Sequence, residues 1–145
     1  MNSDVMFSSK SNEWATPQDL FDKLNNKYHF TLDPCSTIEN HKCEKFYTIE
    51  DDGLIKDWSN DIVFVNPPYD RELYKWVKKC YEESLKGTKI VLLIPSRTDT
   101  KYFHEFLYNK NNVKIEFIKG RLKFGNSHNS APFPSLLAYF NIVED

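Results

Sequence analysis

The sequence predicts one α/β domain with a mostly parallel sheet and helices on both of its faces. Its length of 145 residues suits a single domain. Two continuous apolar runs, at residues 62–66 and 89–95, are typical of strands that are buried on both faces. Segments with helical spacing alternate along the chain with short apolar runs, as expected for helices that pack on a parallel sheet.

The first half of the chain begins with a helix signal at Thr16 and Pro17. Threonine is a favourable N-cap, and proline is tolerated in the first turn, where its missing N–H would have no partner. Apolar residues within 20–24 then recur at helical spacing. Residues 30–33 and 46–48 are expected to form two short strands.

The second half continues the alternation of helices and strands. Apolar residues at helical spacing predict helices over residues 73–85 and 100–108. An alternating pattern predicts an outer strand over residues 113–118, and residues 136–140 are expected to close the sheet. About a dozen residues separate the second strand from the run at 62–66, too few for a further helix–strand unit of average size. We therefore expect a trimmed sheet.

The termini and the cysteines constrain the class of protein. Residues 1–12 are polar and are expected to form a flexible tail before a single domain at residues 13–145. No apolar run is long enough to span a bilayer, and the first residues lack the apolar stretch of a signal peptide. The cysteines Cys35, Cys43 and Cys80 suit a reducing cytoplasm better than a disulfide framework. These features indicate a cytoplasmic protein.

Charge is distributed unevenly although the net charge is only −2. Residues 33–61 contain three lysines and eight acidic residues, a net charge of −5. Residues 86–128 contain nine basic and three acidic residues, a net charge of +6. A basic second half could contact nucleic-acid phosphates, although it could also be an ordinary solvated surface.

The strongest chemical signal is Asn66-Pro67-Pro68-Tyr69, directly after the buried strand. Consecutive prolines cannot continue a central strand, so they form a rigid turn. The Asn66 side-chain oxygen and the Pro67 carbonyl could then converge on an –NH2 group, and the Tyr69 ring could stack on a flat base. An ordinary Asn-Pro turn is the alternative, but the preceding strand is the context that a functional motif requires.

Asn-Pro-Pro-Tyr after a buried strand resembles the catalytic motif of amino-methyltransferases that act on adenine N6. The chain as a whole, from about residue 13 to 140, resembles the phage-type DNA N-6-adenine methyltransferases (Dam-like). Further short motifs carry this resemblance in order: Trp14-Ala15-Thr16-Pro17, Leu32-Asp33-Pro34, Asp52-Gly53-Leu54, Trp58, Gly120-Arg121-Leu122-Lys123-Phe124 and Phe133-Pro134-Ser135.

The resemblance implies a trimmed Rossmann-like class I methyltransferase fold that transfers a methyl group from S-adenosylmethionine to adenine N6 in DNA. In the implied mechanism the base is extruded from the duplex and stacks on Tyr69, while Asn66 and Pro67 hold its amine. The resemblance also implies a phage or prophage origin and action in the bacterial cytoplasm. The expected partner is DNA, without a membrane or a separate recognition domain, and the oligomeric state stays open.

The cofactor site implied by the resemblance lies in the first half of the chain. A helix N-terminus suits the methionine carboxylate, and an acid at a strand end suits its ammonium group. An acid after the second strand can accept the ribose hydroxyls, as in dinucleotide folds. The implied residues are Trp14, Thr16, Pro17, Asp33, Pro34, Glu50, Asp51 and Asp52.

Several of these assignments have structural alternatives. Thr16 could only cap its helix, and Asp33 could be a solvated strand-end acid. The acids at 50–52 could form a solvated turn, and the sequence does not divide the ribose and adenine contacts among them. The segment after Asp33 lacks the glycines that many methyltransferases carry there, which makes close backbone approach to the cofactor harder to argue.

The DNA surface is expected on short loops, with the basic residues supplied by the second half of the chain. Two glycines bracket residues 121–124, a pattern suited to a loop or hairpin, and Arg121 and Lys123 alternate so that both could face the duplex. Phe124 could wall the target pocket or pack in the core, and core packing is the better interpretation of Phe133. The expected DNA-binding residues are Arg97, Lys101, Lys119, Arg121, Lys123 and Phe124.

Two other signals are set aside, and two functional alternatives stay open. Pro34-Cys35 resembles the nucleophile motif of cytosine C5 methyltransferases but follows the wrong strand, and Cys35, His41 and Cys43 match no common zinc spacing, so no metal is expected. The same tetrad could serve N4 of cytosine, adenine in RNA or a protein glutamine. The chain could also be a silent DNA-binding relative, which a cofactor-binding measurement would distinguish.

Overall fold

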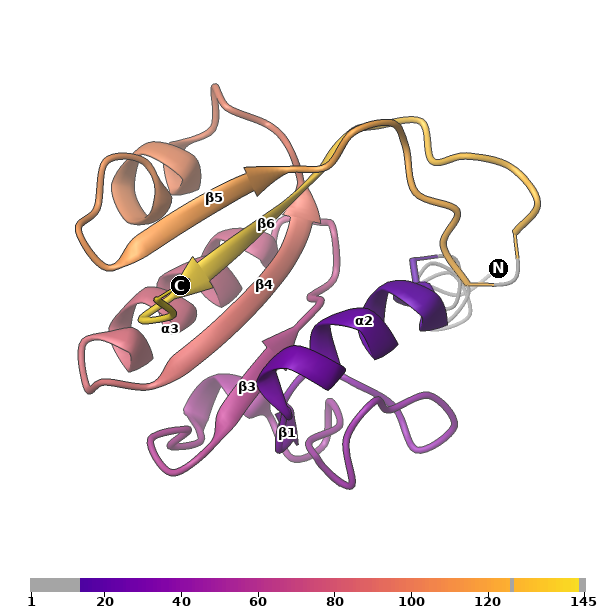
Figure 1. Cartoon of the computed structure of the whole chain (residues 1–145). Helices are drawn as coiled ribbons and strands as arrows, with labels where there is room; N and C mark the ends of the chain where they lie inside the picture. The colour runs from indigo at the N-terminus through magenta and orange to yellow at the C-terminus, as the bar shows by residue number, and fades with distance from the viewer. Residues whose placement is uncertain (1–13, 126, 144–145) are drawn as a thin grey trace.

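The computed structural model describes residues 14–125 and 127–143, so the expected tail at residues 1–12 lies outside the described part. Six strands form one sheet in the order β2-β1-β3-β4-β6-β5 (Figure 1). The strands are β1 (Leu32–Asp33), β2 (Lys45–Phe46), β3 (Ile62–Val65), β4 (Lys89–Pro95), β5 (Val113–Phe117) and β6 (Ser135–Phe140). This confirms the predicted α/β class.

The sheet is mixed, so the prediction of a mostly parallel sheet needs correction. Strands β2, β1, β3 and β4 pair in parallel, but β6 is antiparallel to both β4 and β5. Residues 118–134 between β5 and β6 contain no helix or strand at the described positions. Parallel neighbours need a crossover, usually helical, whereas antiparallel neighbours do not. The connection therefore fits the antiparallel direction of β6.

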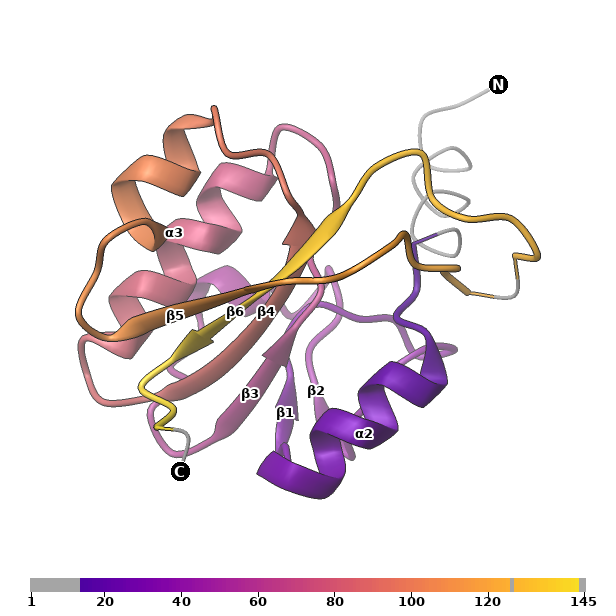
Figure 2. The ribbon, with the colours of Figure 1, turned by 45° about the horizontal axis from the view of Figure 1, so that its top comes forward.

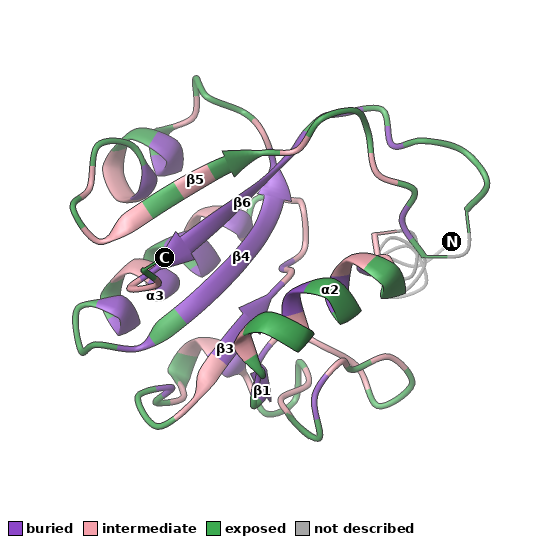
Figure 3. Cartoon of the chain, in the orientation of Figure 1, coloured by how far each residue is buried: buried purple, intermediate pink, exposed green. Residues whose placement is uncertain are grey.

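Helices cover both faces of the sheet (Figure 2). Along β4, Ile90, Leu92 and Ile94 pack towards α3 (Leu73–Ser84), while Val91 and Leu93 pack towards α2 (Gln18–Tyr28). The central strands are accordingly buried on both sides (Figure 3). The continuous apolar runs in the sequence predicted this arrangement correctly.

The helices differ from expectation in two places. Pro17 itself is the N-cap of α2, so Thr16 lies outside the helix and makes no capping bond. The segment predicted as a helix over residues 100–108 contains a π-helical turn, η2 (Phe103–Leu107), closed by the Tyr108 N–H donating to the Phe103 carbonyl. Phe103 and Leu107 are buried against α3, which explains why their spacing resembled an ordinary amphipathic helix.

The short connection between β2 and β3 contains a fully buried tryptophan. Between β2 and β3 the only helical element is the 3-10 turn η1 (Gly53–Ile55). Trp58 follows it, is fully buried, and stacks on Trp76 of α3 with ring centroids 6.4 Å apart. This indole therefore packs the segment after η1 against α3.

Candidate active site

The predicted catalytic and cofactor residues gather at one end of the sheet. Because β1, β3 and β4 are parallel, their carboxyl ends share an edge, and Asp33, Asn66 and Arg97 lie at or just after those ends. The start of α2 lies at the same end, where the long loop between β5 and β6 reaches it (Figure 1). Ligands of open α/β sheets bind at such carboxyl edges.

Asn66 joins the turn after β3 to the segment before α2. Its Nδ2 donates to the Trp14 carbonyl at 2.7 Å and to the Thr16 hydroxyl at 3.0 Å. Thr16 is buried, so its hydroxyl serves this contact rather than the helix. The Asn66 side chain is thus held in one orientation by residues about 50 positions earlier in the chain.

The two proposed acceptors of this turn, Asn66 Oδ1 and the Pro67 carbonyl, differ in their hydrogen bonding. The Asn66 Oδ1 accepts from the Tyr69 hydroxyl at 2.5 Å, which leaves one lone pair for another donor. The buried Pro67 carbonyl accepts no hydrogen bond from residues 14–125 or 127–143. The Tyr69 hydroxyl also lies 3.3 Å from the Leu93 carbonyl, and burial raises the pKa of this phenol well above its ordinary value. Tyr69 is therefore a neutral hydrogen-bond donor here.

Four aromatic rings form a cluster on the Tyr69 side of this turn. Trp14, Tyr69, Phe124 and Phe133 all contact one another, with ring centroids 5.0–6.3 Å apart. We call these four residues the aromatic cluster. Phe124 and Phe133 are both buried, as core packing predicts, and the pocket-wall role of Phe124 stays a prediction. Trp14 packs against Tyr69 of the tetrad.

Asp33 is buried at the end of β1. Its Oδ2 accepts from the Lys42 N–H at 2.8 Å. Burial raises the pKa of Asp33 to about 6, although the N–H groups of Lys42 and Cys35 and the charges of His41 and Lys42 act in the opposite direction. Asp33 is therefore not the solvated acid of the alternative interpretation, and its charge can be switched close to neutral pH.

Gly53 allows a close approach between two segments of the chain that the sequence did not predict. A Cβ atom at Gly53 would lie 2.2 Å from the Pro34 carbonyl oxygen and 3.1 Å from the Trp76 ring. Pro34 directly follows Asp33, so a glycine of the η1 turn lets this turn touch the segment after β1. The glycine signal was present in Asp52-Gly53-Leu54, but only the folded chain shows which backbone it faces.

The three acids after β2 have different surroundings. Asp51 accepts from the Thr48 N–H and hydroxyl, and Asp52, with φ of 58°, accepts from the Leu54 N–H as the N-cap of η1. Glu50 is exposed and makes no polar contact with the described residues. Two of the acids therefore shape the turn, and Glu50 keeps both of its oxygens available.

Lys42 is a polar neighbour of the site that the sequence reasoning missed. Its backbone N–H binds Asp33, and its Nζ donates to the Gln18 side chain at 2.7 Å, in the first turn of α2. Burial lowers the pKa of Lys42, while the charges of Asp33 and Asp22 act against this shift. No motif marked this lysine, because it lies in an irregular segment nine residues after Asp33.

The predicted DNA-binding residues occupy different surroundings. Lys119, Arg121 and Lys123 are exposed on the 118–134 loop, with Leu122 and Phe124 turned inwards between them. The Arg97 guanidinium lies 6.0 Å from the Phe133 ring, so it borders the aromatic cluster. Lys101 instead lies 3.7 Å from Glu105 and over the Tyr74 ring, beside η2 and α3.

Other features of the surface lie away from this edge. A hollow lined by Tyr81, Ser84, Gly87, Asn112, Asn141 and their neighbours lies at the amino end of β4 and contains none of the predicted site residues. In the described ranges, no three His, Cys, Asp or Glu side chains form a group that could hold a metal ion. No helix there is long and apolar enough to cross a membrane.

Comparisons with known proteins agree with the motif order. The chain is 36% identical over 98 residues to a DNA N-6-adenine-methyltransferase of Escherichia phage T1, covering 66% of this chain and 41% of that protein. It is 28% identical over 116 residues to a DNA N-6-adenine-methyltransferase of Haemophilus phage HP1, covering 79% of this chain and 66% of that protein. The chain thus spans less than two thirds of the length of either relative.

A family model described as DNA N-6-adenine-methyltransferase (Dam) matches residues 4–135. This match contains the Asn66 turn, Asp33, Gly53 and the whole 118–134 loop, and it extends over most of the sequence. The chain therefore belongs to the DNA N-6-adenine-methyltransferase (Dam) family.

Proposed function

We propose that this chain transfers a methyl group from S-adenosylmethionine to the N6 amine of adenine in DNA, on a trimmed class I methyltransferase fold. The observation that carries this proposal is the turn after β3. Asn66 Oδ1 with one remaining lone pair and the unpartnered Pro67 carbonyl lie there at the same sheet edge as Asp33. Since the substrate is DNA and the relatives are phage proteins, the proposed place of action is the bacterial cytoplasm.

The protein residues hold the amine and do not form a covalent bond with it. When bound, S-adenosylmethionine supplies an electrophilic methyl group. Asn66 and Pro67 accept the two amine hydrogens, which leaves the nitrogen lone pair free and fixes its direction. Pro68 keeps the Pro67 carbonyl in an extended turn. Tyr69 supports Asn66 through its hydroxyl and supplies an aromatic face.

The residues around Asp33 fit a sulfonium amino acid nucleoside. The buried carboxylate of Asp33 would bind the ammonium group, and the start of α2 beside Thr16 and Pro17 would receive the carboxylate. Gly53 lets the segments on either side of this site approach closely. We assign the ribose hydroxyls to Glu50, because Asp51 and Asp52 already accept hydrogen bonds from their own turns.

The product of the reaction tests this function directly. Genomic and synthetic DNA incubated with the protein and S-adenosylmethionine should yield N6-methyl-2′-deoxyadenosine after digestion to nucleosides and mass spectrometry. RNA and a glutamine-containing peptide should remain unmodified. N4-methyl-2′-deoxycytidine as the product would overturn the base assignment. Cofactor binding by calorimetry without any methylated product would instead indicate the silent relative.

Cofactor affinity should decrease in acid because of Asp33. With a pKa of about 6, the carboxylate is mostly ionised at pH 7.5 and mostly protonated at pH 5. The dissociation constant for S-adenosylmethionine should therefore rise about tenfold between these values. Calorimetric titration measures this, and Asp33→Asn should bind weakly with no such dependence. Equal wild-type affinity at both pH values would contradict the assignment of Asp33.

DNA binding should depend steeply on salt and should involve Arg121 and Lys123. Both are exposed on the loop that borders the aromatic cluster. Each lost phosphate contact lowers the slope of log K against log salt by about 0.9, so the double alanine variant should lose about 1.8. The matched control is Lys110→Ala with Lys114→Ala, which removes two charges elsewhere and should keep the slope. If both double variants give the parent slope, the loop is not the DNA surface.

A further inference from the structure

An indole ring stacks on Tyr69 in this structure, where the proposed function places the target base. Trp14 lies across it with an interplanar angle of 26°, whereas Phe124 and Phe133 meet it edge-on at 83°. The only ring stacked on Tyr69 among the described residues is therefore an indole. Phe124 and Phe133 are buried, whereas Trp14 and Tyr69 are half-buried, so the stacked pair is the more exposed part of the aromatic cluster.

The backbone around Trp14 is held by contacts that can be exchanged. Its carbonyl accepts from Asn66 Nδ2 at 2.7 Å, and the next carbonyl, at Ala15, accepts from the Gly125 N–H at 2.8 Å. The segment 14–16 thus connects the catalytic turn to the 118–134 loop. Neither bond involves a buried charge, and both acceptors can bind water once the segment moves.

We infer that the indole of Trp14 occupies the place of the target base in the free protein, and that an extruded purine displaces it. This inference rests on the proposed function and adds to it. An indole is a flat bicyclic ring of nearly purine size, so a pocket that fits it also fits adenine. A cytosine ring or a glutamine amide would leave part of that space unfilled. Trp14 is then a specificity-determining residue for a bicyclic base.

The same arrangement couples base entry to the catalytic turn. When segment 14–16 moves, Asn66 Nδ2 loses its bond to Trp14, and the 118–134 loop loses its bond to Ala15. Arg97 borders Phe133, and Arg121 and Lys123 lie on the released loop. DNA phosphates can therefore favour the displaced position of the loop while the base replaces the indole.

The direct test follows the three tryptophans by fluorine NMR of protein labelled with 5-fluorotryptophan. Trp58 and Trp76 are buried beside α3 and serve as internal controls, and Trp14→Phe assigns the third signal. The probe is a duplex with one adenine opposite an abasic site, since such a base leaves the stack easily. The Trp14 signal should shift on binding, and the other two should stay. An unchanged Trp14 signal at saturation would overturn the inference.

Binding affinity provides the second readout. Without the competing indole, Trp14→Ala should bind this duplex about five- to tenfold more tightly than the wild type. Its affinity for the same duplex with cytosine opposite the abasic site should change little. Weaker binding of the adenine duplex would show that Trp14 is itself a base or cofactor contact and would overturn the inference. If Trp14→Ala does not fold, the fluorine signal of Trp14 in the wild type decides whether the base displaces the indole.

The outcomes separate this inference from the proposed function. Formation of N6-methyl-2′-deoxyadenosine by a protein whose Trp14 signal does not move would refute the displacement and leave the function intact. A Trp14 signal that moves with the adenine duplex, in a protein without methyl transfer, would support the displacement and refute the function.

Discussion

Replacing Asn66 with alanine should lower the turnover number for methyl transfer about 10²- to 10³-fold. In the proposed mechanism the Asn66 oxygen accepts a hydrogen from the target amine, and this bond strengthens as the nitrogen becomes positive in the transition state. The affinity for S-adenosylmethionine should change little, because the cofactor residues surround Asp33. A methyl-transfer assay beside calorimetric titration measures both quantities.

The matched control for this variant is Asn141→Ala. Asn141 also follows a strand, and its Nδ2 also donates two hydrogen bonds, to the Ser84 and Thr88 carbonyls. Asn141 lies at the opposite end of the sheet from the tetrad. The substitution therefore removes two amide hydrogen bonds of the same kind without changing the tetrad. Both variants should lose similar stability in a thermal melt. If the methyl-transfer rate per folded molecule is equal in Asn66→Ala and Asn141→Ala, Asn66 has only a structural role.

Asn66→Asp refines the same test. The carboxylate keeps the acceptor for Tyr69 but loses the two N–H donations, and its second oxygen faces the Trp14 carbonyl. Two lost hydrogen bonds of about 1 kcal/mol each correspond to a loss of about 30-fold. Activity should therefore fall between the wild type and Asn66→Ala.

The fold was predictable where local signals and buried packing coincide. The β4 run is apolar at every position between Ile90 and Ile94, and it pairs on both sides, so one pattern indicated both strand and burial. Strands β1 and β2 have only two residues each and were predicted too long. Their extent depends on neighbours and not on composition.

The sequence predicted which residues lie at the carboxyl ends of the strands, but it did not predict the contacts that these residues make. Parallel strands bring Asp33 and Asn66 to one edge, and this follows from the topology alone. The bonds of Asn66 to Thr16 and Trp14 span about 50 residues, and Gly53 approaches Pro34 across the second strand. Such pairs leave no periodic signal. The sequence therefore predicted which residues lie at this edge of the sheet and missed the partners that orient them.

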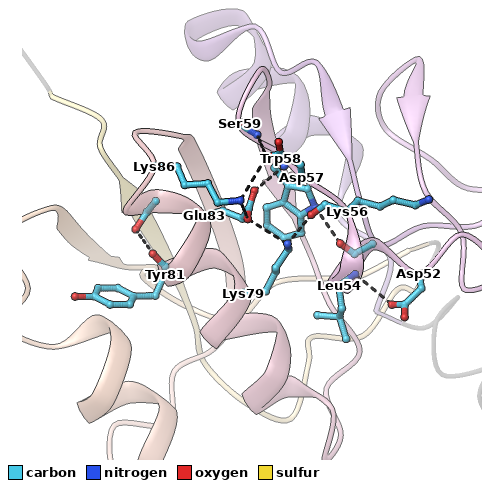
Figure 4. Close-up of polar contacts among 12 residues, drawn as sticks. Asp52, Leu54, Lys56, Asp57, Trp58, Ser59, Lys79, Tyr81, Glu83 and Lys86 are labelled. Carbon is cyan, nitrogen blue, oxygen red and sulfur yellow. Dashed lines mark hydrogen bonds and ion pairs between the residues drawn. The ribbon is translucent and has the colours of Figure 1, made fainter.

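The packing around Trp58 includes a buried carboxylate in α3 that the sequence analysis did not consider. Glu83 accepts from the Trp58 N–H at 2.6 Å, from Lys86 Nζ at 2.7 Å and from Lys79 Nζ at 3.1 Å (Figure 4). Lys79 also donates to the Lys56 carbonyl and lies 5.3 Å from the Trp58 ring. These contacts attach α3 to the segment that follows η1.

Glu83→Ala should lower the free energy of unfolding by about 3–5 kcal/mol, because it leaves the mostly buried Lys79 ammonium and the Trp58 N–H without their acceptor. A loss of this size corresponds to a fall in Tm of about 10–20 °C. The control is Glu82→Ala, an exposed neighbour in the same helix, which should change stability by less than about 0.5 kcal/mol. Denaturant unfolding of both variants measures the difference.

The contribution of Glu83 to the free energy of unfolding should decrease in acid. Burial alone would raise the pKa of Glu83, but hydrogen bonds from Lys86, Trp58 and Lys79 together lower it below its ordinary value of 4.5. A lowered pKa in the folded state means that the contribution is fully present above about pH 4.5. It is lost as the pH falls through the lowered value, so the stability gap between wild type and Glu83→Gln should narrow there. A gap that stays constant down to pH 2 would show that Glu83 acts by shape and not by charge.

Loss of this network should reach the cofactor site through one hydrogen bond. Trp58 Nε1 donates to the Gly53 carbonyl at 3.0 Å, and Gly53 packs directly against the Pro34 backbone. If Glu83→Gln stays folded, a shifted Trp58 would move Gly53 and weaken S-adenosylmethionine binding while the Asn66 turn is untouched. Cofactor affinity should then fall with little change in turnover at saturating cofactor, the opposite of the pattern for Asn66→Ala. Unchanged affinity in a folded but destabilised Glu83→Gln would confine Glu83 to stability alone.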